Sequence, residues 1–498
     1  MSGESKHPPE AISGEELRQM RPVQPKLARP SRIGNGGRRR YWSLGGPCAI
    51  LMGIFLASLA VGAEPWPVLT LLPQDRILIL APHPDDEVLG CGGIIQRAVA
   101  SSLPVRIVFL TYGDNNEWSF WVYRKRPVVM PGSMRQMGMV RHNEAIAAAR
   151  SLGLSPDRLT FLGYPDFGCL NIWYAHWEGS PAFLSMLTRV RAVPYASAWR
   201  PGAPYKGEDI LQDLETILRE FKPTKIFVSH PADHNPDHLA LYLFTRVALW
   251  DLASELKPEV YPYLIHFKHW PEPRGYHPTV PLQPPSMLRQ EVSWEQNLLT
   301  PNQVERKRLA LKAHRTQYAY SGGYLLSFVR PNELFGDFPV VRLPGIQGGP
   351  LQPAGWPTSA AENKPPQGLT DEERAAFIGI ESRSVRLEHD QLEVSLAFSK
   401  PLGKSVEAAL YLFGYRSDRP FGQMPKLHVT LGEFGHAIYD QKTSLPSETL
   451  QVRRQPREVT IRVSLQALGN PERILTGART YLADVPLDWV SWRVLELR

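Results

Sequence analysis

Two clusters of histidine and carboxylate residues follow apolar runs that are typical of buried β-strands. The first cluster, Pro-His-Pro-Asp-Asp-Glu at residues 82–87, comes directly after Ile-Leu-Ile-Leu at residues 77–80. The second, at residues 229–238, comes after Lys-Ile-Phe-Val at residues 225–228. Imidazole and carboxylate groups are preferred zinc ligands, and a catalytic zinc site typically takes three of them and leaves one position to water. The two clusters therefore indicate a catalytic metal site.

Within the first cluster, His83 and Asp86 can each supply one metal ligand. Asp85 is then free to accept a proton from the attacking water. We choose His238 as the third ligand, because two strands of one sheet can bring both clusters to the same crevice. The alternatives are structural. Asp85 or Asp86 could cap the helix that follows, and an isolated histidine in the second cluster could be a hydrogen-bonded loop residue.

The order of these motifs resembles the PIG-L (LmbE-like) deacetylase family. Residues 82–87 are similar to the family's AHPDDE block, and residues 236–238 to its late PDH block. Between them, Arg141 and Glu144 match its R-x-x-E helix. The resemblance extends over roughly residues 75–248. It implies a zinc-dependent enzyme that hydrolyses the acetamide of an N-acetylglucosamine-type sugar or glycoconjugate.

The resemblance also implies roles for single residues. The implied Zn²⁺ ligands are His83, Asp86 and His238. The implied general base is Asp85. The chain departs from the family at Asn235, because many members have a histidine there that is thought to assist the oxyanion. We assign this catalytic role to His234, one residue earlier; a hydrogen bond from Asn235 or another group are the alternatives.

Two further polar residues are candidates for contacts with the substrate. Arg141 is one, although a structural pair with Glu144, three residues later on the same helix, is the simpler explanation. Asp114 follows the apolar run at residues 105–110, so it can reach the same crevice and bind sugar hydroxyls. An ordinary polar turn is the alternative for this segment. His314 is predicted to be a surface or hydrogen-bonded histidine rather than a ligand.

The elements that must position these residues alternate along the chain. We expect strands at residues 77–81, 105–110, 159–162 and 225–229, with helices between them. This order is typical of an α/β fold, a Rossmann-like parallel sheet flanked by helices. Continuous apolar runs indicate strands that are buried on both faces. We assign this catalytic domain to residues 72–340.

The C-terminal part of the chain has a different pattern. Residues 341–370 are rich in Pro and Gly without a hydrophobic period, which predicts a linker. Residues 371–498 contain runs of alternating apolar and polar residues separated by turn residues. Such alternation is typical of half-buried strands, so we expect a smaller β-sandwich-like accessory domain.

The N-terminal part predicts export. Residues 1–40 form a polar, basic tail that we expect to be disordered, and residues 41–63 carry no charged side chain. The apolar centre of this segment, residues 49–61, is shorter than the roughly 20 residues that span a bilayer. We therefore favour a cleaved signal peptide over a membrane anchor, and expect a periplasmic or extracellular protein with possible membrane association through residues 41–63.

Charge argues against a nucleic-acid partner. The net charge is +7, but the first 41 residues hold nine Lys/Arg and four Asp/Glu, or +5, which leaves about +2 for the rest. No basic run interleaved with aromatic residues occurs outside the tail. Two alternatives to a sugar deacetylase stay open: a non-catalytic exported glycan-binding protein, and a metal amidohydrolase that acts on another amide.

Overall fold

The computed structural model describes most of the chain after residue 65. The described residues are 66–115, 130–343, 354–357, 365, 369–403, 405–483 and 485–497. The predictions for the tail and for residues 41–63 lie outside them. Among the described residues, no helix combines the length and the hydropathy that a membrane span requires.

The central sheet has five parallel strands in the order β3-β2-β1-β4-β5. They are β1 (Ile77–Ala81), β2 (Val105–Thr111), β3 (Leu159–Tyr164), β4 (Lys225–Ser229) and β5 (Glu259–Tyr263). Every residue of β1 and β4 is buried, as continuous apolar runs require in a sheet that is covered on both faces. The predicted Rossmann-like α/β fold is confirmed. Strand β5 was not predicted, because Glu-Val-Tyr-Pro-Tyr has neither a continuous apolar run nor a clean alternation.

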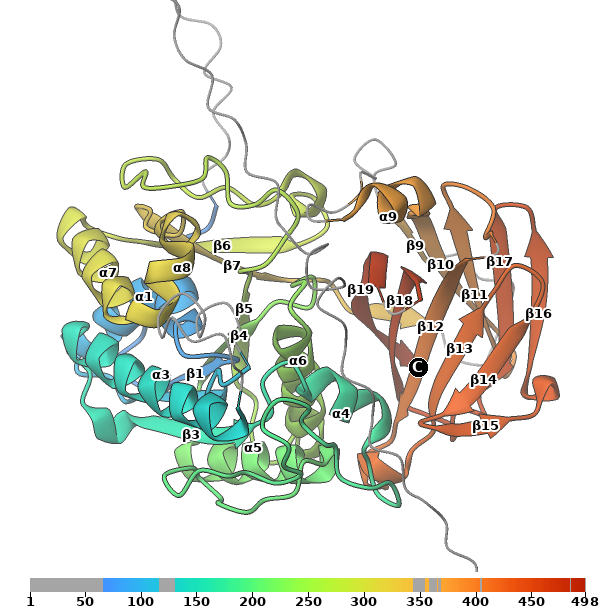
Figure 1. Cartoon of the computed structure of the whole chain (residues 1–498), viewed down its shortest axis with the longest axis horizontal. Helices are drawn as coiled ribbons and strands as arrows, with labels where there is room; N and C mark the ends of the chain where they lie inside the picture. Colours follow the sequence, from blue (N-terminus) through green and yellow to red (C-terminus); the bar gives the residue numbers. More distant parts are fainter. Residues whose placement is uncertain are drawn as a thin grey trace, which may run out of the picture. The chain divides into compact units, whose positions relative to one another are not determined.

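Helices cover the sheet in two groups, which lie on opposite sides of it in Figure 1. The first group is α1 (Asp86–Ala100), α3 (Pro131–Ser151) and α7 (Pro301–Ala313). The second is α4 (Cys169–Ala175), α5 (Gly207–Phe221) and α6 (Pro236–Asp251). Helix α8 (Arg315–Leu326) follows α7, and a hairpin of β6 (Ser293–Leu298) and β7 (Asn332–Asp337) completes this region. Helices α1 and α6 begin just after β1 and β4, so their first turns share one edge of the sheet.

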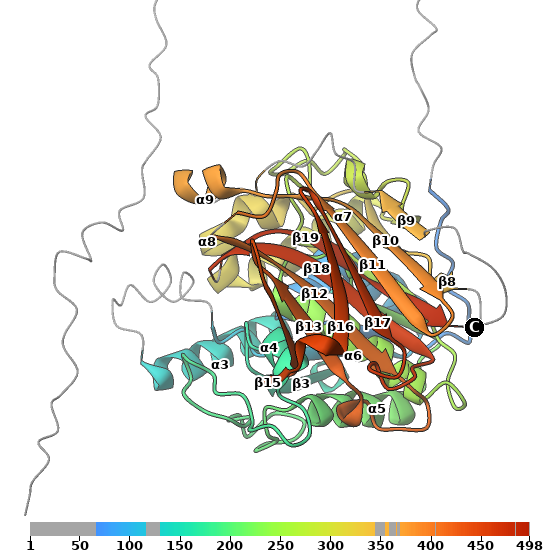
Figure 2. The same cartoon turned by 90° about the vertical axis from the view of Figure 1, so that its right-hand side faces the viewer.

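Two sheets form the C-terminal region, as predicted for a β-sandwich, and buried apolar residues of both sheets form one core. Figure 2 views the strands of this region from its outer side. One contains β9 (Ala354–Pro357), β10 (Ile380–Glu388), β11 (Gln391–Phe398), β16 (Leu450–Gln455) and β17 (Glu458–Ser464). The other contains β8 (Val341–Leu343), β12 (Val406–Tyr415), β13 (Lys426–Leu431), β14 (His436–Asp440), β15 (Thr443–Leu445), β18 (Arg473–Leu482) and β19 (Val485–Leu497). The short helix α9 (Asp371–Ala376) lies between β9 and β10 in the chain. Strand β11 alternates strictly between buried and half-buried residues, which is the predicted pattern.

The predicted linker contains two strands that its composition did not indicate. Strand β8 pairs with β19, and β9 pairs with β10, each at the edge of a C-terminal sheet. Edge strands need only backbone hydrogen bonds to one neighbour, so a Pro/Gly-rich sequence can form them without an apolar period. Residues 341–343 and 354–357 therefore belong to the C-terminal sheets.

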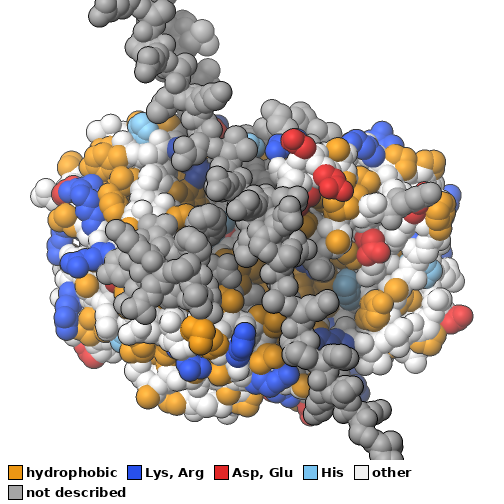
Figure 3. All heavy atoms as spheres, viewed as in Figure 1, with side chains coloured by type: hydrophobic (Ala, Val, Ile, Leu, Met, Phe, Trp, Pro, Cys, Tyr) orange, Lys and Arg blue, Asp and Glu red, His pale blue; other side chains and the backbone are white. Residues whose placement is uncertain are grey.

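Aromatic side chains join the catalytic region to the C-terminal sheets. The ring of Trp173 on α4 stacks on Phe413 and Phe421, with centroids 5.7 and 5.2 Å away. Trp492 of β19 meets the same ring edge-on at 6.3 Å. The described residues from Trp66 onward accordingly form one compact unit. On the face drawn in Figure 3, the visible Lys and Arg side chains lie in several separate groups.

Candidate metal centre and active site

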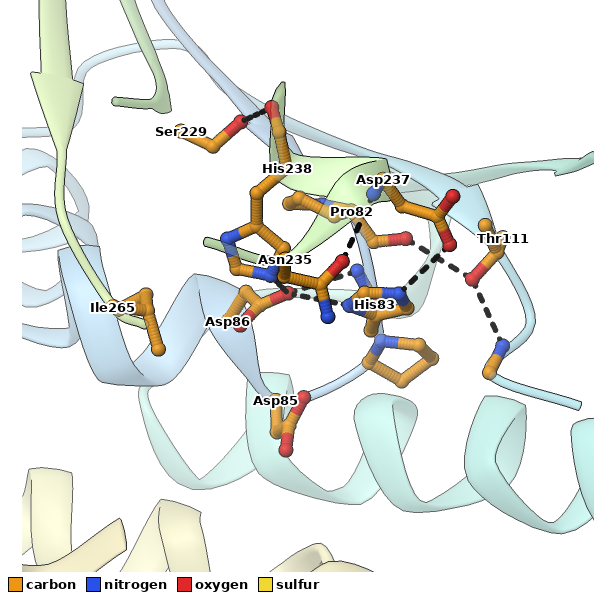
Figure 4. Close-up of polar contacts among 12 residues, drawn as sticks. Pro82, His83, Asp85, Asp86, Thr111, Ser229, Asn235, Asp237, His238 and Ile265 are labelled. Carbon is orange, nitrogen blue, oxygen red and sulfur yellow. Dashed lines mark hydrogen bonds and ion pairs between the residues drawn. The ribbon is translucent and has the colours of Figure 1, made fainter. Parts of the chain in front are cut away.

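The carboxyl ends of β1 and β4 meet because these strands are parallel neighbours in the sheet. His83 lies two residues after β1, Asp86 is the first residue of α1, and His238 is in the first turn of α6. The structure thus brings the three predicted ligands together at one edge. Figure 4 shows their side chains pointing toward one another, with Asn235 beside them.

The geometry of these three side chains fits a bound metal ion. His83 Nδ1 lies 3.1 Å and His238 Nε2 lies 3.0 Å from Asp86 Oδ2. All three residues are buried, and their ligand atoms lie within 4.8 Å of one another. His238 Nε2 makes no hydrogen bond despite its short distance to Asp86. Two imidazoles and one carboxylate that converge in this way are a typical donor set for zinc.

In each of the two histidines, a carboxylate contacts the ring nitrogen that does not face Asp86. Asp233 Oδ2 lies 3.1 Å from His238 Nδ1, and Asp237 Oδ2 lies 3.2 Å from His83 Nε2. Such partners orient metal-binding imidazoles and make them more basic. Burial lowers the pKa of His238, but Asp233 and Asp86 outweigh it and raise this pKa to about 9. The site therefore favours positive charge, which a metal cation also supplies.

A second group of possible ligands shares His83. Its Nε2 atom lies 3.0 Å from Asp166 Oδ1 and 3.2 Å from Asp237 Oδ2. These three residues also converge within 4.8 Å. However, the Asp237 carboxylate already accepts the backbone N–H groups of Phe167 and Cys169, at 2.5 and 3.0 Å. The first group is the better donor set, because its two imidazoles are oriented by carboxylates that lie outside it.

Asp85 does not cap helix α1. It occupies the N-cap position without a capping hydrogen bond from its side chain, and its φ of 137° is rare for a residue other than glycine. Its side chain lines the same cavity as His83 and Asp86. Burial raises the pKa of Asp85 to about 7, although Arg141 opposes this shift. A strained, buried carboxylate beside a metal site is a common feature of functional sites.

Arg141 supports Asp85 and does not pair with Glu144. Its guanidinium donates to the carbonyls of Pro84 and Gly113, at 2.8 and 3.1 Å, and lies 3.3 Å from Asp85 Oδ1. The left-handed φ of Gly113, 66°, and its missing side chain allow this close approach. Glu144 instead accepts hydrogen bonds from the backbone and hydroxyl groups of Thr316. The predicted pair between Arg141 and Glu144 is therefore wrong.

Two predicted site residues lie elsewhere. Asp114 is buried, accepts a 2.5 Å hydrogen bond from the hydroxyl of Tyr195, and is not among the residues that line the cavity. His234 packs against Phe267 and Trp489, with ring centroids 4.9 and 4.0 Å away, and lines other cavities. The structure therefore brings neither residue to the metal centre: Asp114 is held by Tyr195, and His234 packs between Phe267 and Trp489.

Other residues take their places in a cavity of about 460 Å³. Lining residues that were not assigned from the sequence include Asp166, Asn235, His266, Gln317, Tyr320 and Tyr324. Asp166 could have been predicted from the sequence. It follows a proline directly after strand β3, as His83 follows a proline directly after strand β1.

His266 follows the unpredicted strand β5, and its ring centroid lies 4.8 Å from that of His238. Asn235 accepts the backbone N–H of Asp237 as the N-cap of α6. His314 is buried and lies 3.0 Å from Glu87 through Nε2, so it is a partnered histidine, as predicted, rather than a surface one.

Comparisons with known proteins agree with this geometry. Residues 78–249 match the family model described as PIG-L: GlcNAc-PI de-N-acetylase. A 1D-myo-inositol 2-acetamido-2-deoxy-α-D-glucopyranoside deacetylase from Saccharopolyspora erythraea is 29% identical over 38% of this chain and 58% of its own length. A protein of the same name from Kribbella flavida is 26% identical over 53% of this chain and 91% of its own length.

Among solved structures, the N,N'-diacetylchitobiose deacetylase from Pyrococcus horikoshii is 21% identical, with a TM-score of 0.30 over 49% of this chain and 70% of that chain. The matched segment of this chain spans just over half of the first relative and nearly all of the second. The family model covers β1 to β4 and nearly all of α6, which position all three converging ligands. Residues 78–249 of this chain are therefore a PIG-L family domain.

Proposed function

We propose that this protein is a zinc-dependent deacetylase that hydrolyses the acetamide of an N-acetylglucosamine-type sugar or glycoconjugate. The observation that carries this proposal is the convergence of His83, Asp86 and His238. Asp85 lines the same cavity as His83 and Asp86. The PIG-L match and the acetamido-sugar substrates named for both curated relatives support the proposal.

In this proposal, His83, Asp86 and His238 hold the zinc ion. When bound, zinc supplies Lewis acidity, because it lowers the pKa of a water ligand to about 7 and polarises a carbonyl group. The carboxylates of Asp233 and Asp237 keep the imidazole rings of His238 and His83 in place for this purpose.

Asp85 is the general base. It accepts one proton from the water whose oxygen bonds to the acetamide carbon. When the C–N bond breaks, the same carboxyl group returns this proton to the sugar nitrogen, and a free amine and acetic acid result. The acid then ionises to acetate, and its proton is taken up by the amine or the solvent. Arg141 is a positioning residue, since it lies against Asp85 and the backbone of Pro84.

We assign support of the developing oxyanion to His266. It lines the cavity next to His238, whereas His234 points into other cavities. A hydrogen-bond donor that is already in position stabilises the negative charge of the transition state. Asn235 is the second candidate: its side-chain oxygen accepts the backbone N–H of Asp237, and the amide NH2 of the same side chain can donate to the oxyanion.

We also propose that the protein is exported. The support is the uncharged segment at residues 41–63 behind a basic tail. Fractionation of the producing cells, with detection of the processed N-terminus, tests this proposal.

The test of the proposed function combines metal analysis with acetate release. Wild-type protein, His83→Ala and the control His389→Ala, which changes an exposed histidine of the C-terminal region, are each given N-acetylglucosamine, chitooligosaccharides and peptidoglycan fragments. We expect one zinc per chain and acetate release for wild type and control, and neither for His83→Ala. A zinc-loaded wild type that releases acetate from other amides but from no acetamido sugar would contradict the substrate class.

A further inference from the structure

A second cavity adjoins the catalytic cavity and is lined by both regions of the molecule. Its volume is about 250 Å³, and α4, the start of α6, β12, β18 and β19 line it. Phe167 lines both cavities. Neighbouring residues of one loop line different cavities: Asn235 lines the catalytic cavity, whereas His234 and Pro236 line the second. The two cavities are therefore neighbours.

Phe167 marks the boundary between them. Its φ of 56° is left-handed, which is unfavourable for phenylalanine, and its backbone N–H donates to Asp237 Oδ2 at 2.5 Å. Its side chain is 48% exposed. The hydrogen bond to Asp237 thus holds an exposed apolar residue at the place where the two cavities meet.

Aromatic rings form part of the wall of the second cavity. Tyr174 is half-buried and stacks on Tyr411, with ring centroids 4.5 Å apart and planes 11° apart. Trp489 is also half-buried and lines the same cavity. The C–H faces of a pyranose ring pack well on such aromatic faces, while tyrosine hydroxyl and tryptophan N–H groups can bond to its polar rim.

Arg479 adds a cationic donor to this wall. Its guanidinium carbon lies 5.5 Å from the ring centroids of both Tyr174 and Tyr411, and its Nε makes no hydrogen bond. Burial lowers the pKa of Arg479, but the neighbouring Tyr174, Tyr411 and Tyr481 outweigh it and raise this pKa. Arg479 lines the cavity, and a guanidinium group favours a ligand that carries oxygen acceptors.

We propose that the second cavity is a subsite for a second sugar ring, joined to the sugar whose acetamide lies in the catalytic cavity. The inference rests on the proposed function and narrows its substrate to an oligosaccharide or glycoconjugate with at least two sugar rings. Tyr174 and Trp489 stack on the ring, and Arg479 donates hydrogen bonds to its oxygens. Arg479 and Trp489 lie outside residues 78–249, so the C-terminal region takes part in substrate selection.

The first test is kinetic. The kcat/KM for N,N'-diacetylchitobiose is divided by that for N-acetylglucosamine in wild type, in Arg479→Met and in the control Arg453→Met, which changes an exposed arginine on β16. We expect Arg479→Met to lower this ratio roughly 10- to 100-fold, the usual effect of losing a hydrogen bond from a charged donor. The control should keep the wild-type ratio. An unchanged ratio in Arg479→Met would overturn the proposal.

The second test does not need turnover. Calorimetric titration with N,N'-diacetylchitobiose uses the zinc-loaded full chain carrying Asp85→Asn, which keeps the sugar from being hydrolysed. We expect a Kd at least about tenfold weaker when Arg479→Met is added to this chain. If neither sugar is deacetylated, the proposed function fails while this titration still decides the subsite. Equal affinities with and without Arg479→Met would show that the cavity does not select a second sugar ring. The same conclusion would follow if n-octyl β-glucoside, which has an alkyl chain in place of a second ring, bound more tightly than the disaccharide to the chain with Arg479 intact.

Discussion

The carboxyl edge of the central sheet and the interior of the C-terminal sandwich are both buried, but their chemistry is opposite. At the sheet edge, His83, Asp86 and His238 lie within 4.8 Å of one another. In the sandwich, alternate residues of β11 from Leu392 to Phe398 are apolar and at most 1% exposed. Burial of ionisable groups costs free energy, whereas burial of apolar groups stabilises the fold. The comparison indicates that the sheet edge is built for ligand chemistry and the interior of the sandwich for stability.

The largest effect should come from His238→Ala. This change removes one of three ligands, so we expect loss of bound zinc. A bound metal lowers the activation free energy by several kcal/mol, so we also expect kcat/KM to fall by more than about 10⁴-fold. Metal content and acetate release are the measurements. Retained zinc with normal turnover would move the metal centre to the group formed by His83, Asp166 and Asp237.

Asp85→Asn separates metal binding from proton transfer. The amide is nearly isosteric but cannot accept the proton, so we expect normal zinc content and a kcat lower by roughly 10² to 10⁴-fold. The matched control is Asp390→Asn, in an exposed turn of the C-terminal region. Full activity of Asp85→Asn would remove Asp85 from the mechanism and weaken the contrast between the two regions.

Leu396→Ala tests the sandwich half of the comparison. Leu396 is fully buried, so its truncation should lower the free energy of unfolding by about 2–5 kcal/mol and leave zinc content unchanged. Urea unfolding followed by circular dichroism measures this. Ser395→Ala, on the opposite face of the same strand, should cost about 1 kcal/mol through its hydrogen bond to Thr460. Equal losses in both variants would show that the core is not packed as described.

Lys426 is an ionisable group buried near the aromatic contact of the two regions, and it predicts a pH-dependent effect on stability. Burial lowers its pKa from 10.5 to about 7, against the opposing pull of Asp440 and Glu208. Between these two values the unfolded chain binds more protons, so stability rises with pH, by at most about 1.4 kcal/mol per unit. Below the folded-state pKa this dependence disappears, because both states are protonated.

The measurement is urea unfolding of wild type and Lys426→Met from about pH 6 to pH 10. The stability of wild type relative to Lys426→Met should be constant below pH 7 and rise above it. A difference that stays constant over the whole range would show that Lys426 remains protonated. Its contacts with the rings of Trp177 and Phe421, 4.6 and 4.3 Å from Nζ, would explain that result.

Much of the metal centre could be predicted from the sequence. Apolar runs identified β1 and β4, and polar residues directly after a parallel strand must lie at the carboxyl edge of the sheet. This rule was enough to bring His83, Asp86 and His238 together. The strict alternation along β11 likewise predicted a sandwich, because one face of each strand must be apolar to cover the core.

The direction of each loop side chain could not be predicted. His234 and Asn235 are adjacent in the sequence, yet they line different cavities, since the path of the backbone before α6 decides which one faces the metal centre. Asp114 and Asp166 both follow strands, and only Asp166 reaches the cavity. These outcomes depend on packing against neighbours such as Tyr195 rather than on residue type.

The sequence by itself determined the fold class, the ligand types and their place at strand ends. Hydrophobic periodicity and the alternation of strands and helices, which indicate these features, can be read along the chain. Only the tertiary structure decided which distant elements complete the site. Helix α8 brings Tyr320 and Tyr324 to the catalytic cavity, and β18 and β19 bring Arg479 and Trp489 to its neighbour. Contacts between segments more than 200 residues apart arise from the packing of whole layers, and no local pattern encodes them.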